Sequence, residues 1–246
     1  LSSHPCGLVL VDERDRMGSD IDGEGDPVQL ARARTKNYPL GKVIVASTPT
    51  VEGASPIQSL FDTSTMFRWA WRCKACYQLF CPCLALLRWP KDATEIEATR
   101  TAVVVCEHCE HPHNDADKEE LNAGGEYVAH RRDENGVYVP LDSPRDLTTW
   151  GYWVSGICSP WVRIGELAAV LISAYASKDQ DSIQAVVNTW GGETWKVKGV
   201  APEWAEVASR RLEYSPGQIM PGVQIITLGA DVQQNGIYYV VRGWGF

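Results

Sequence analysis

Two adjacent carboxylates, Asp12 and Glu13, directly follow a run of four apolar residues, Leu8–Val11. An apolar strand that ends in two acids suits an NTPase, in which the Asp holds Mg²⁺ and the Glu orients or deprotonates the attacking water. The same residues also fit a strand that merely ends in polar side chains. This pair alone leaves both interpretations open.

A second strand end has matching chemistry. The segment "ASTPT" contains Ser47, Thr48 and Pro49 and ends the next apolar run, residues 42–46. In NTPase motors a hydroxyl-bearing turn at this place can sense the γ-phosphate and pass its loss to a neighbouring segment. A structural turn closed by Pro49 would look the same in isolation. Two such strand ends in this order favour the NTPase interpretation.

The cysteines give the most specific local signal. Two Cys-x-x-Cys pairs, Cys73 with Cys76 and Cys106 with Cys109, are separated by residues 77–105. Four thiolates in two such pairs can hold a structural tetrahedral Zn²⁺, as in a zinc ribbon. Further candidates lie close by, and they could replace one pair, form a second site or be bystanders: Cys81, Cys83, His108, His111 and His113. Cys6 and Cys158 stand in apolar strings and are expected to be buried thiols.

Asp231 lies within "TLGADVQ", an apolar segment predicted to be a strand. Burying an unpaired acid in a strand is costly, and a metal ion is one solution, as in two-metal nucleases. The alternative is an acid at a strand edge that caps the following turn, and the sequence does not decide between them. The tryptophans are expected to be core and interface anchors rather than a surface for stacking bases.

The amino-acid composition limits which classes of protein this chain can belong to. The 246 residues are 44% hydrophobic and 22% charged, which predicts a packed core and excludes wholesale disorder. The net charge of -8 argues against a protein that coats nucleic acid through a uniform field, although a local basic groove stays possible. No apolar run is long enough for a membrane span, and no signal peptide precedes the first strand. The default location is cytoplasmic, where eight cysteines indicate metal ligands before disulfides.

Apolar periodicity places these residues on elements. Short apolar runs at 8–11 and 42–46 are of the kind expected for strands buried on both faces. They bracket an acidic loop and a helix from Pro27 to about Lys36, which predicts a parallel α/β sheet. Two amphipathic helices are expected around 167–174 and 183–190, the second with Asp181 or Ser182 as N-cap. A strand–turn–strand unit is expected around "QQNG" near the C-terminus. Both ends of the sequence read as mid-element, so an internal piece of a longer protein is expected.

The ordered set of motifs resembles the large terminase subunit of tailed bacteriophages, in the lambda-like branch, which packages DNA into procapsids. The matching segments are "VDERDR", "DGEGDPVQLARART", "KVIVASTPTVEGASPI", "CKAC", "CEHC", "SPW", "NTWGGETW" and "GADVQ". The resemblance implies that Asp12 holds magnesium and that Glu13 is the catalytic carboxylate. It implies that Ser47, Thr48 and Pro49 form the motif coupling hydrolysis to DNA movement, and that Asp231 is the first metal-binding acid of a nuclease.

The resemblance also implies an α/β architecture in four parts. These are the C-terminal part of a RecA-like P-loop ATPase (1–65), a zinc-ribbon-like region (66–127), an aromatic and helical linker (128–215) and the first hairpin of an RNase H-like nuclease (216–246). The implied cofactors are ATP, Mg²⁺, structural Zn²⁺ and a divalent metal for the nuclease. The implied partners are double-stranded DNA, the small terminase subunit, the portal protein and further copies of the chain, with no membrane, in the infected bacterium's cytoplasm and transiently at the procapsid portal.

One departure from the family is the phosphate-binding loop, because no G-x-x-x-x-G-K-[ST] segment occurs and it would have to lie upstream of Leu1. The remaining nuclease acids would lie downstream, so the piece alone is expected to be inactive. A DEAD-like helicase is the first alternative, because "VDERDRM" and the later "STP" resemble two of its motifs. A non-enzymatic zinc-binding adaptor is the second alternative, which explains the cysteines but not the two strand ends.

Overall fold

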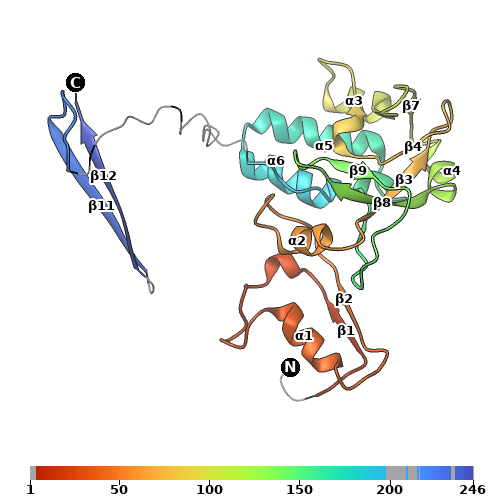
Figure 1. Cartoon of the computed structure of the whole chain (residues 1–246). Coiled ribbons are helices and arrows are strands. Elements are labelled where there is room, and N and C mark those ends of the chain that lie inside the picture. Colours follow the sequence, from red (N-terminus) through yellow and green to blue (C-terminus); the bar gives the residue numbers. More distant parts are fainter. Residues whose placement is uncertain (1–3, 198–208, 210–214, 216, 234–235, 246) are drawn as a thin grey trace. The chain divides into compact units, whose positions relative to one another are not determined.

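The described part of the chain is a mixed α/β structure with several small sheets (Figure 1). The computed structural model describes residues 4–197, 209, 215, 217–233 and 236–245. The chain divides into two compact units, Leu1–Val197 and Lys198–Phe246, which are treated separately below. Among the described residues, no helix is both long and apolar enough to cross a membrane.

The strands are β1 (Leu8–Val11), β2 (Lys42–Val45), β3 (Phe67–Arg72), β4 (Leu79–Phe80), β5 (Leu87–Arg88), β6 (Val103–Val105), β7 (Pro112–His113), β8 (Glu126–Arg132), β9 (Tyr138–Pro140), β10 (Tyr152–Trp153), β11 (Ile225–Gln233) and β12 (Gly236–Trp244). The longer helices are α1 (Pro27–Thr35), α2 (Pro56–Asp62), α3 (Glu95–Thr101), α4 (Lys118–Ala123), α5 (Ile164–Ser177) and α6 (Gln180–Val186). Short helical turns are η1 (Arg14–Arg16), η2 (Leu84–Leu86), η3 (Gly156–Cys158) and η4 (Val187–Gly191).

The N-terminal strand–helix–strand unit is confirmed. β1 and β2 pair in parallel, with Val11 opposite Val45, and α1 between them begins at Pro27. Asp26 is the N-cap of α1, and its side chain accepts hydrogen bonds from the backbone N–H groups of Val28 and Gln29. A helical crossover of this kind is the usual way to connect neighbouring parallel strands.

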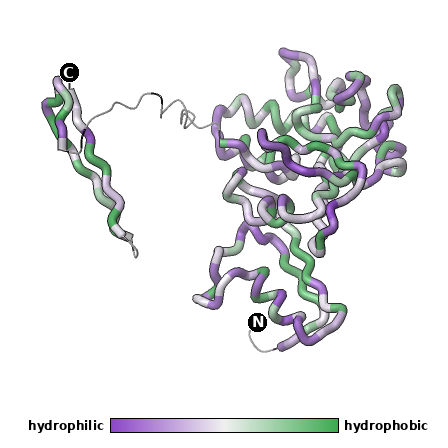
Figure 2. Tube along the Cα trace, viewed as in Figure 1, coloured by the Kyte–Doolittle hydropathy of each residue, from purple (hydrophilic) through white to green (hydrophobic). Residues whose placement is uncertain are grey.

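The expectation that both faces of these strands are buried is wrong. Buried and exposed side chains alternate along β1, and Leu10 and Ile44 are 67% and 53% exposed. Helix α1 packs against the two strands, and its buried residues Val28 and Ala31 cover one side of the sheet only. Figure 2 shows the apolar character of this strand pair in green.

A second sheet occupies the middle of the first unit. Its strand order is β10-β3-β8-β9, and β4 pairs with β3 beside this path. β10 runs parallel to β3, whereas β8 is antiparallel to both of its neighbours. Because side chains alternate along a strand, Phe67 and Trp69 of β3 lie on one face and Arg68 lies on the other.

The apolar core lies among these strands and helices α3, α5 and α6. Ile164, Leu167 and Leu171 of α5 are buried in it, together with Trp71 of β3. Gly165 is required where α5 meets α3, because a Cβ there would lie 2.1 Å from the carbonyl oxygen of Thr99. The role predicted for the tryptophans is therefore right for Trp71 and for the partly buried Trp69, Trp190 and Trp195, whereas Trp150 and Trp161 are exposed.

The predicted helix pair is present as α5 and α6, but the predicted cap of the second helix is wrong. Helix α6 begins at Gln180, and its N-cap is Asp179. The Asp179 carboxylate accepts hydrogen bonds from the backbone N–H groups of Asp181 and Ser182, the two residues expected to be caps. The first N–H groups of a helix have no partner within the helix, and Asp179 accepts hydrogen bonds from two of them.

The second unit contains an antiparallel pair of strands. β11 and β12 pair from Ile225 opposite Trp244 to Gln233 opposite Gly236, as the sequence predicts. The predicted turn residues Gln234 and Asn235 lie outside the described residues.

Candidate functional site

The two chemically matching strand ends lie at the same edge of the β1–β2 sheet. Because the strands are parallel and in register, Asp12 and Glu13 leave β1 where residues 46–49 leave β2. The Ala46 N–H donates to the Val11 carbonyl at 2.8 Å, and the Arg14 N–H donates to the Ala46 carbonyl at 3.3 Å. This is the C-terminal edge of a parallel pair, where nucleotide sites of α/β proteins are found.

The acid pair is open to solvent at this edge. Both Asp12 and Glu13 are exposed, and the Glu13 N–H donates to Oδ1 of Asp12 at 3.0 Å. Glu13 has a φ of 53°, in the left-handed region that residues with a side chain rarely adopt. Strained backbone of this kind concentrates at functional sites, where the surrounding structure imposes it.

Asp15 holds the loop after β2 in place, although no sequence pattern singled it out. Its Oδ2 accepts hydrogen bonds from the Thr50 N–H at 3.0 Å, the Thr50 hydroxyl at 2.9 Å and the Ser55 hydroxyl at 2.5 Å. Its Oδ1 accepts the Ile57 N–H at 2.7 Å, and its own N–H donates to the Ser47 hydroxyl at 3.0 Å. The carboxylate two residues after Glu13 thus holds the segment that contains Ser47 and Pro49.

A buried ion pair supports the same edge. The Arg14 side chain is 5% exposed, and its guanidinium lies 2.6 Å from Oδ2 of Asp26. Partial burial favours the neutral acid, but the hydrogen bonds from Arg14 and from the N–H groups of Gln29 and Val28 outweigh it and lower the pKa of Asp26. The start of α1 is therefore attached to the turn that follows the acid pair.

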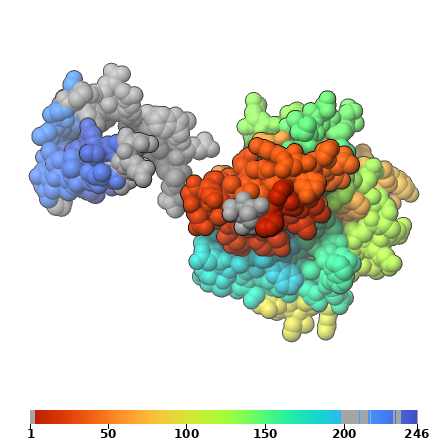
Figure 3. All heavy atoms as spheres, turned by 90° about the horizontal axis from the view of Figure 1, so that it is seen from below, coloured from red at the N-terminus to blue at the C-terminus, as the bar shows by residue number. Residues whose placement is uncertain are grey.

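The segment after Pro49 is bonded to a distant part of the chain. The Thr50 carbonyl accepts hydrogen bonds from the Trp195 N–H at 2.8 Å and from the Asn188 side chain at 2.9 Å. The Glu52 N–H in turn donates to the Trp195 carbonyl at 2.9 Å. Figure 3 shows the N-terminal segment, red to orange, beside cyan residues of the helical region.

The four predicted zinc ligands come together. The Sγ atoms of Cys73, Cys76, Cys106 and Cys109 all lie within 4.8 Å of one another. Cys73 and Cys109 are 3.6 Å apart, and Cys76 and Cys106 are 3.8 Å apart. With Zn–S bonds of about 2.3 Å, a tetrahedral site places its sulfurs roughly 3.8 Å apart. The cluster therefore fits zinc, and these distances are much longer than a disulfide bond.

The two pairs also share one local backbone geometry. In the first pair the Ala75 N–H donates to Sγ of Cys73, and in the second the His108 N–H donates to Sγ of Cys106, each at 3.4 Å. Although burial opposes ionisation, N–H groups of Cys76 and Ala75 help lower the pKa of Cys73 to about 6. Burial and the neighbouring thiols raise the pKa of Cys106 to about 12, because closely spaced thiolates repel one another.

The remaining cysteines are not in this cluster. Sγ of Cys81 lies 3.8 Å from Nε2 of His130, and burial raises the pKa of both Cys81 and Cys83 to about 11. Cys158 is buried as expected, whereas Cys6 is only partly buried. Cys81 and Cys83 are therefore separate from the four-cysteine cluster.

The three nearby histidines also stay outside the cluster. Nε2 of His108 lies 2.9 Å from the Leu79 carbonyl oxygen. His113 is fully buried and stacks on Phe80, with ring centroids 5.6 Å apart, and His111 contacts it edge-on.

Asp231 belongs to the second unit. Its backbone lies in β11, opposite Tyr238 of β12. The placement of its side chain lies outside the described part, so its relation to a metal stays a prediction.

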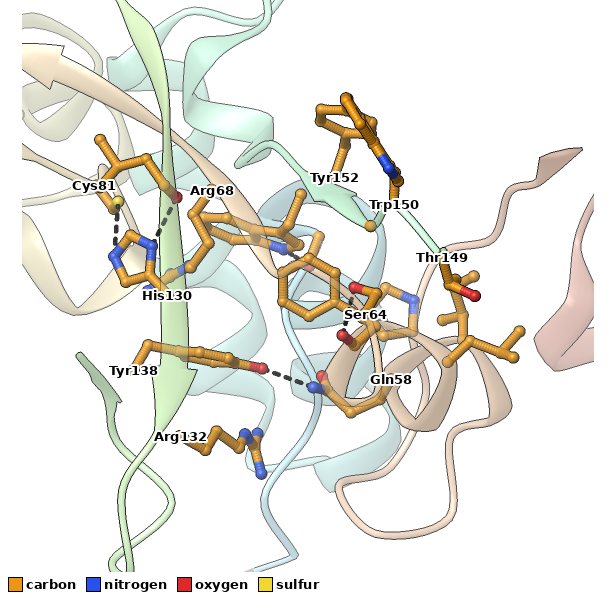
Figure 4. Close-up of a pocket in the computed structure, with 18 of the residues that line it drawn as sticks. Gln58, Ser64, Arg68, Cys81, His130, Arg132, Tyr138, Thr149, Trp150 and Tyr152 are labelled. Atoms are coloured by element: carbon orange, nitrogen blue, oxygen red, sulfur yellow. Dashed lines mark hydrogen bonds between the residues drawn. The ribbon is translucent and has the colours of Figure 1, made fainter. Parts of the chain in front are cut away.

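A cavity of about 1800 Å³ opens within the first unit. Ser47 and Pro49 line it, together with charged and aromatic residues of the middle sheet, among them Arg68, His130, Tyr138 and Trp153 (Figure 4). The sequence did not indicate this cavity, because its walls come from segments far apart in the chain.

Comparisons with known proteins agree over most of the chain. Residues 1–127 match the family described as the phage terminase large subunit gpA, ATPase domain. Residues 149–246 match the terminase large subunit gpA, endonuclease domain. A large terminase subunit of Enterobacteria phage P21 is 24% identical over 259 aligned residues, which cover 96% of this chain and 38% of that relative. No solved structure matches the chain significantly.

Proposed function

Because the chain belongs to the phage terminase large subunit gpA family, we propose that it is part of a DNA-packaging motor. The parent protein would couple ATP hydrolysis to the movement of double-stranded DNA into a procapsid and would cut concatemeric DNA. The chain spans 38% of the length of its phage P21 relative. The activities proposed here are therefore those of a longer protein.

The observation on which this proposal rests is the edge where β1 and β2 end together. Asp12 would hold the magnesium of bound ATP, which neutralises charge on the phosphates, and Glu13 would orient and deprotonate the attacking water. In support, both carboxylates are exposed at this edge, and Glu13 has a left-handed backbone with φ of 53°. A RecA-like ATPase sheet for residues 1–65 is part of the same proposal.

Ser47, Thr48 and Pro49 would transmit the result of hydrolysis. Ser47 is bonded to the N–H of Asp15, two residues after Glu13, so a shift at the acid pair reaches this turn directly. Thr50, the next residue, is bonded to Trp195 and Asn188. This continuous set of contacts supports a coupling role for the segment. The segment would control the DNA-stimulated ATP turnover of the parent protein.

The four clustered cysteines would hold a structural zinc ion. Their sulfur positions fit a tetrahedral site, and the ion would neutralise the thiolates that otherwise repel one another. We assign residues 66–127 to a zinc-ribbon-like region and residues 128–215, including the undescribed ones, to the linker.

Residues 216–246 would begin an RNase H-like nuclease, with Asp231 as an acid for its divalent metal. In support, the match to the endonuclease domain, over residues 149–246, includes this segment, and β11 pairs with β12 within it. The further acids of such a site would come from elsewhere in the parent protein.

The proposed partners are double-stranded DNA, the small terminase subunit, the portal protein and further copies of the chain. The proposed location is the cytoplasm of the infected bacterium, with transient residence at the procapsid portal. The helicase alternative and the zinc-adaptor alternative gain no support, because both family matches are to terminase domains.

The decisive test uses the full-length parent with Glu13→Gln. We expect DNA-stimulated ATP hydrolysis to fall at least about 100-fold, because general-base catalysis typically contributes 10²–10⁴-fold. Glu24→Gln is the matched control, since Glu24 is exposed in the neighbouring loop and its side chain has no hydrogen bond or ion pair among the described residues. Unchanged turnover in the Glu13 variant would remove this residue from the catalytic role.

A further inference from the structure

Arg68 of β3 projects into the cavity lined by the middle sheet (Figure 4). It lies on the face of the sheet opposite Phe67 and Trp69. His130 of β8, Tyr138 of β9 and Trp153 of β10 lie around it on the same lining. Four strands therefore contribute to the surroundings of this one guanidinium group.

Two aromatic rings enclose the guanidinium. Its Cζ lies 4.3 Å from the centroid of the Trp153 ring and 4.5 Å from the centroid of the Tyr138 ring. The Trp153 Nε1–H donates to the Gly192 carbonyl at 2.6 Å, and the Tyr138 hydroxyl is bonded to Gln58 at 2.6 Å. Because both rings are anchored, the group is held in position before any ligand arrives.

The N–H groups of Arg68 have no acceptor within the described part of the protein. Among the described residues, Arg68 makes neither a hydrogen bond nor an ion pair, and none of its nitrogens is sealed from solvent. Arg132, which also lies near the Tyr138 ring, differs because it pairs with Glu52 at 3.3 Å and Asp62 at 3.4 Å. The aromatic rings attract the cation but leave its in-plane hydrogen-bond donors open to the cavity.

Among the described residues, no neighbouring acid forms an ion pair with this cation. Burial, and to a smaller extent the charge of Arg68, lower the pKa of His130, so this imidazole is neutral at pH 7. Burial raises the pKa of Cys81 to about 11, so its thiol is neutral as well. Glu193 lies near enough for the charge of Arg68 to act on it, but burial outweighs that charge and the Leu84 N–H and raises the pKa of Glu193. Its Oε1 accepts the Leu84 N–H at 2.6 Å and forms no ion pair with Arg68.

We propose that Arg68 binds a phosphate group of a nucleotide unit, which enters the cavity and receives the open N–H groups of the guanidinium. An arginine fork matches phosphate oxygens in a bidentate arrangement. Trp150, which precedes β10, lines the same cavity and is 67% exposed, so it offers a face on which an attached base can stack. The nucleotide unit can belong to a free nucleotide or to a nucleic-acid strand, because both present the same phosphate chemistry.

The test measures binding of three probes to the 246-residue chain. The probes are ATP, a fluorescein-labelled single strand and a fluorescein-labelled duplex, and binding is followed by calorimetry and anisotropy at several salt concentrations. Arg68→Gln removes the charge and the fork, whereas Arg68→Lys keeps the charge alone. Arg131→Gln is the matched control, because Arg131 is exposed on β8 and alternation places it on the opposite face of the sheet.

We expect Arg68→Gln to weaken binding of at least one probe about tenfold, as loss of one charge-assisted contact does. If the phosphate comes from a strand, the slope of log K against log salt falls by about 0.9 for the duplex or about 0.7 for the single strand. If it comes from a free nucleotide, only ATP binding weakens. Arg131→Gln leaves the affected affinity unchanged.

Three results would overturn the proposal. The first is the absence of measurable binding of any probe to the unmodified chain, and the second is unchanged affinities in Arg68→Gln. The third is an equal loss in Arg131→Gln, which would indicate a general charge effect. If circular dichroism shows that Arg68→Gln is unfolded, Arg68→Lys decides: weaker binding with an unchanged salt slope supports the site, and unchanged affinity refutes it. None of these results depends on Glu13, so they are separate from the test of the motor function.

Discussion

At the scale of single residues, Asp15 connects the turn after β1 to the loop after β2. Its carboxylate accepts hydrogen bonds from Thr50, Ser55 and Ile57. We expect Asp15→Asn to lower the free energy of unfolding by about 2 kcal/mol, because an amide leaves one or more of these donors unpaired. Urea denaturation measures this loss.

The control for this prediction is Glu24→Gln, the same chemical change at an exposed carboxylate. Its free energy of unfolding should stay within about 0.5 kcal/mol of the unmodified chain. An equally small effect of Asp15→Asn would show that these hydrogen bonds contribute nothing net to stability.

At this scale, sequence reasoning identified candidate site residues that form short motifs. It missed residues whose partners come from distant segments of the chain. The Cys-x-x-Cys pairs are short patterns, and the structure brings their four sulfurs together as predicted. The acid pair is a short pattern too, and its catalytic role stays a prediction. Asp15 was missed because the groups it bonds lie 35 to 42 residues away in the sequence. Arg68 was missed for the same reason, because Tyr138 and Trp153 come from two other strands.

At the scale of elements, Asp26 stabilises the start of α1 in two ways. Its carboxylate caps the helix and pairs with buried Arg14. We expect Asp26→Ala to lower the free energy of unfolding at pH 7 by about 2 kcal/mol, from the lost cap and the unpaired buried charge. Asp26→Asn keeps a hydrogen-bond acceptor for the helix cap, so we expect it to lower the free energy of unfolding less. The loss that remains in this variant measures the contribution of the carboxylate charge.

The same ion pair predicts a pH dependence. Because the folded-state pKa of Asp26 lies below its unfolded value of about 3.9, its charge contribution is complete above that pH. It is lost as the pH falls through the folded-state pKa. The difference between the unmodified chain and Asp26→Asn should therefore shrink between pH 5 and pH 2, which unfolding curves across this range can check. A constant difference would contradict the assignment.

The cysteine cluster predicts the metal content. We expect one zinc ion per chain that survives Cys81→Ser and Cys83→Ser and is lost in Cys106→Ser, because only Cys106 belongs to the cluster of four sulfurs. Elemental analysis of the purified variants measures this, and chelation should lower the thermal midpoint. The reverse pattern among the variants would overturn the ligand assignment.

Secondary structure was predictable where periodicity and end signals agree. β1, α1, β2 and the β11–β12 pair combine apolar runs with proline or glycine boundaries. Helix α3 was missed although Thr94 and Glu97 form a capping box, a signal that the sequence does contain. The burial of β1 and β2 was overestimated, because an apolar run does not reveal how many faces neighbouring elements cover.

At the scale of the whole molecule, the first unit has its own core. The buried apolar residues of this core run from Trp71 to Val186, all within Leu1–Val197. We expect a chain of residues 1–197 to keep a cooperative thermal transition and its zinc content, because the truncation removes none of these residues. Calorimetry and elemental analysis test this against the full chain. Loss of the transition would show that the first unit depends on residues 198–246.

The two-unit organisation was only partly predictable. The motif order anticipated the matches to an ATPase domain and an endonuclease domain. The contacts of Thr50 with Asn188 and Trp195 were not predictable, because no local pattern pairs segments so distant in the sequence. These contacts make the N-terminal strand pair and the helical region parts of one unit.

The left-handed backbone of Glu13 has an evolutionary consequence. With φ at 53°, this position would be about 1 kcal/mol more stable with glycine, which adopts that conformation freely. Selection for a sturdier fold and selection for hydrolysis would then act on this position in opposite directions. A redesign of the chain guided by stability alone would replace Glu13 with glycine. It would raise the free energy of unfolding and remove the proposed catalytic carboxylate.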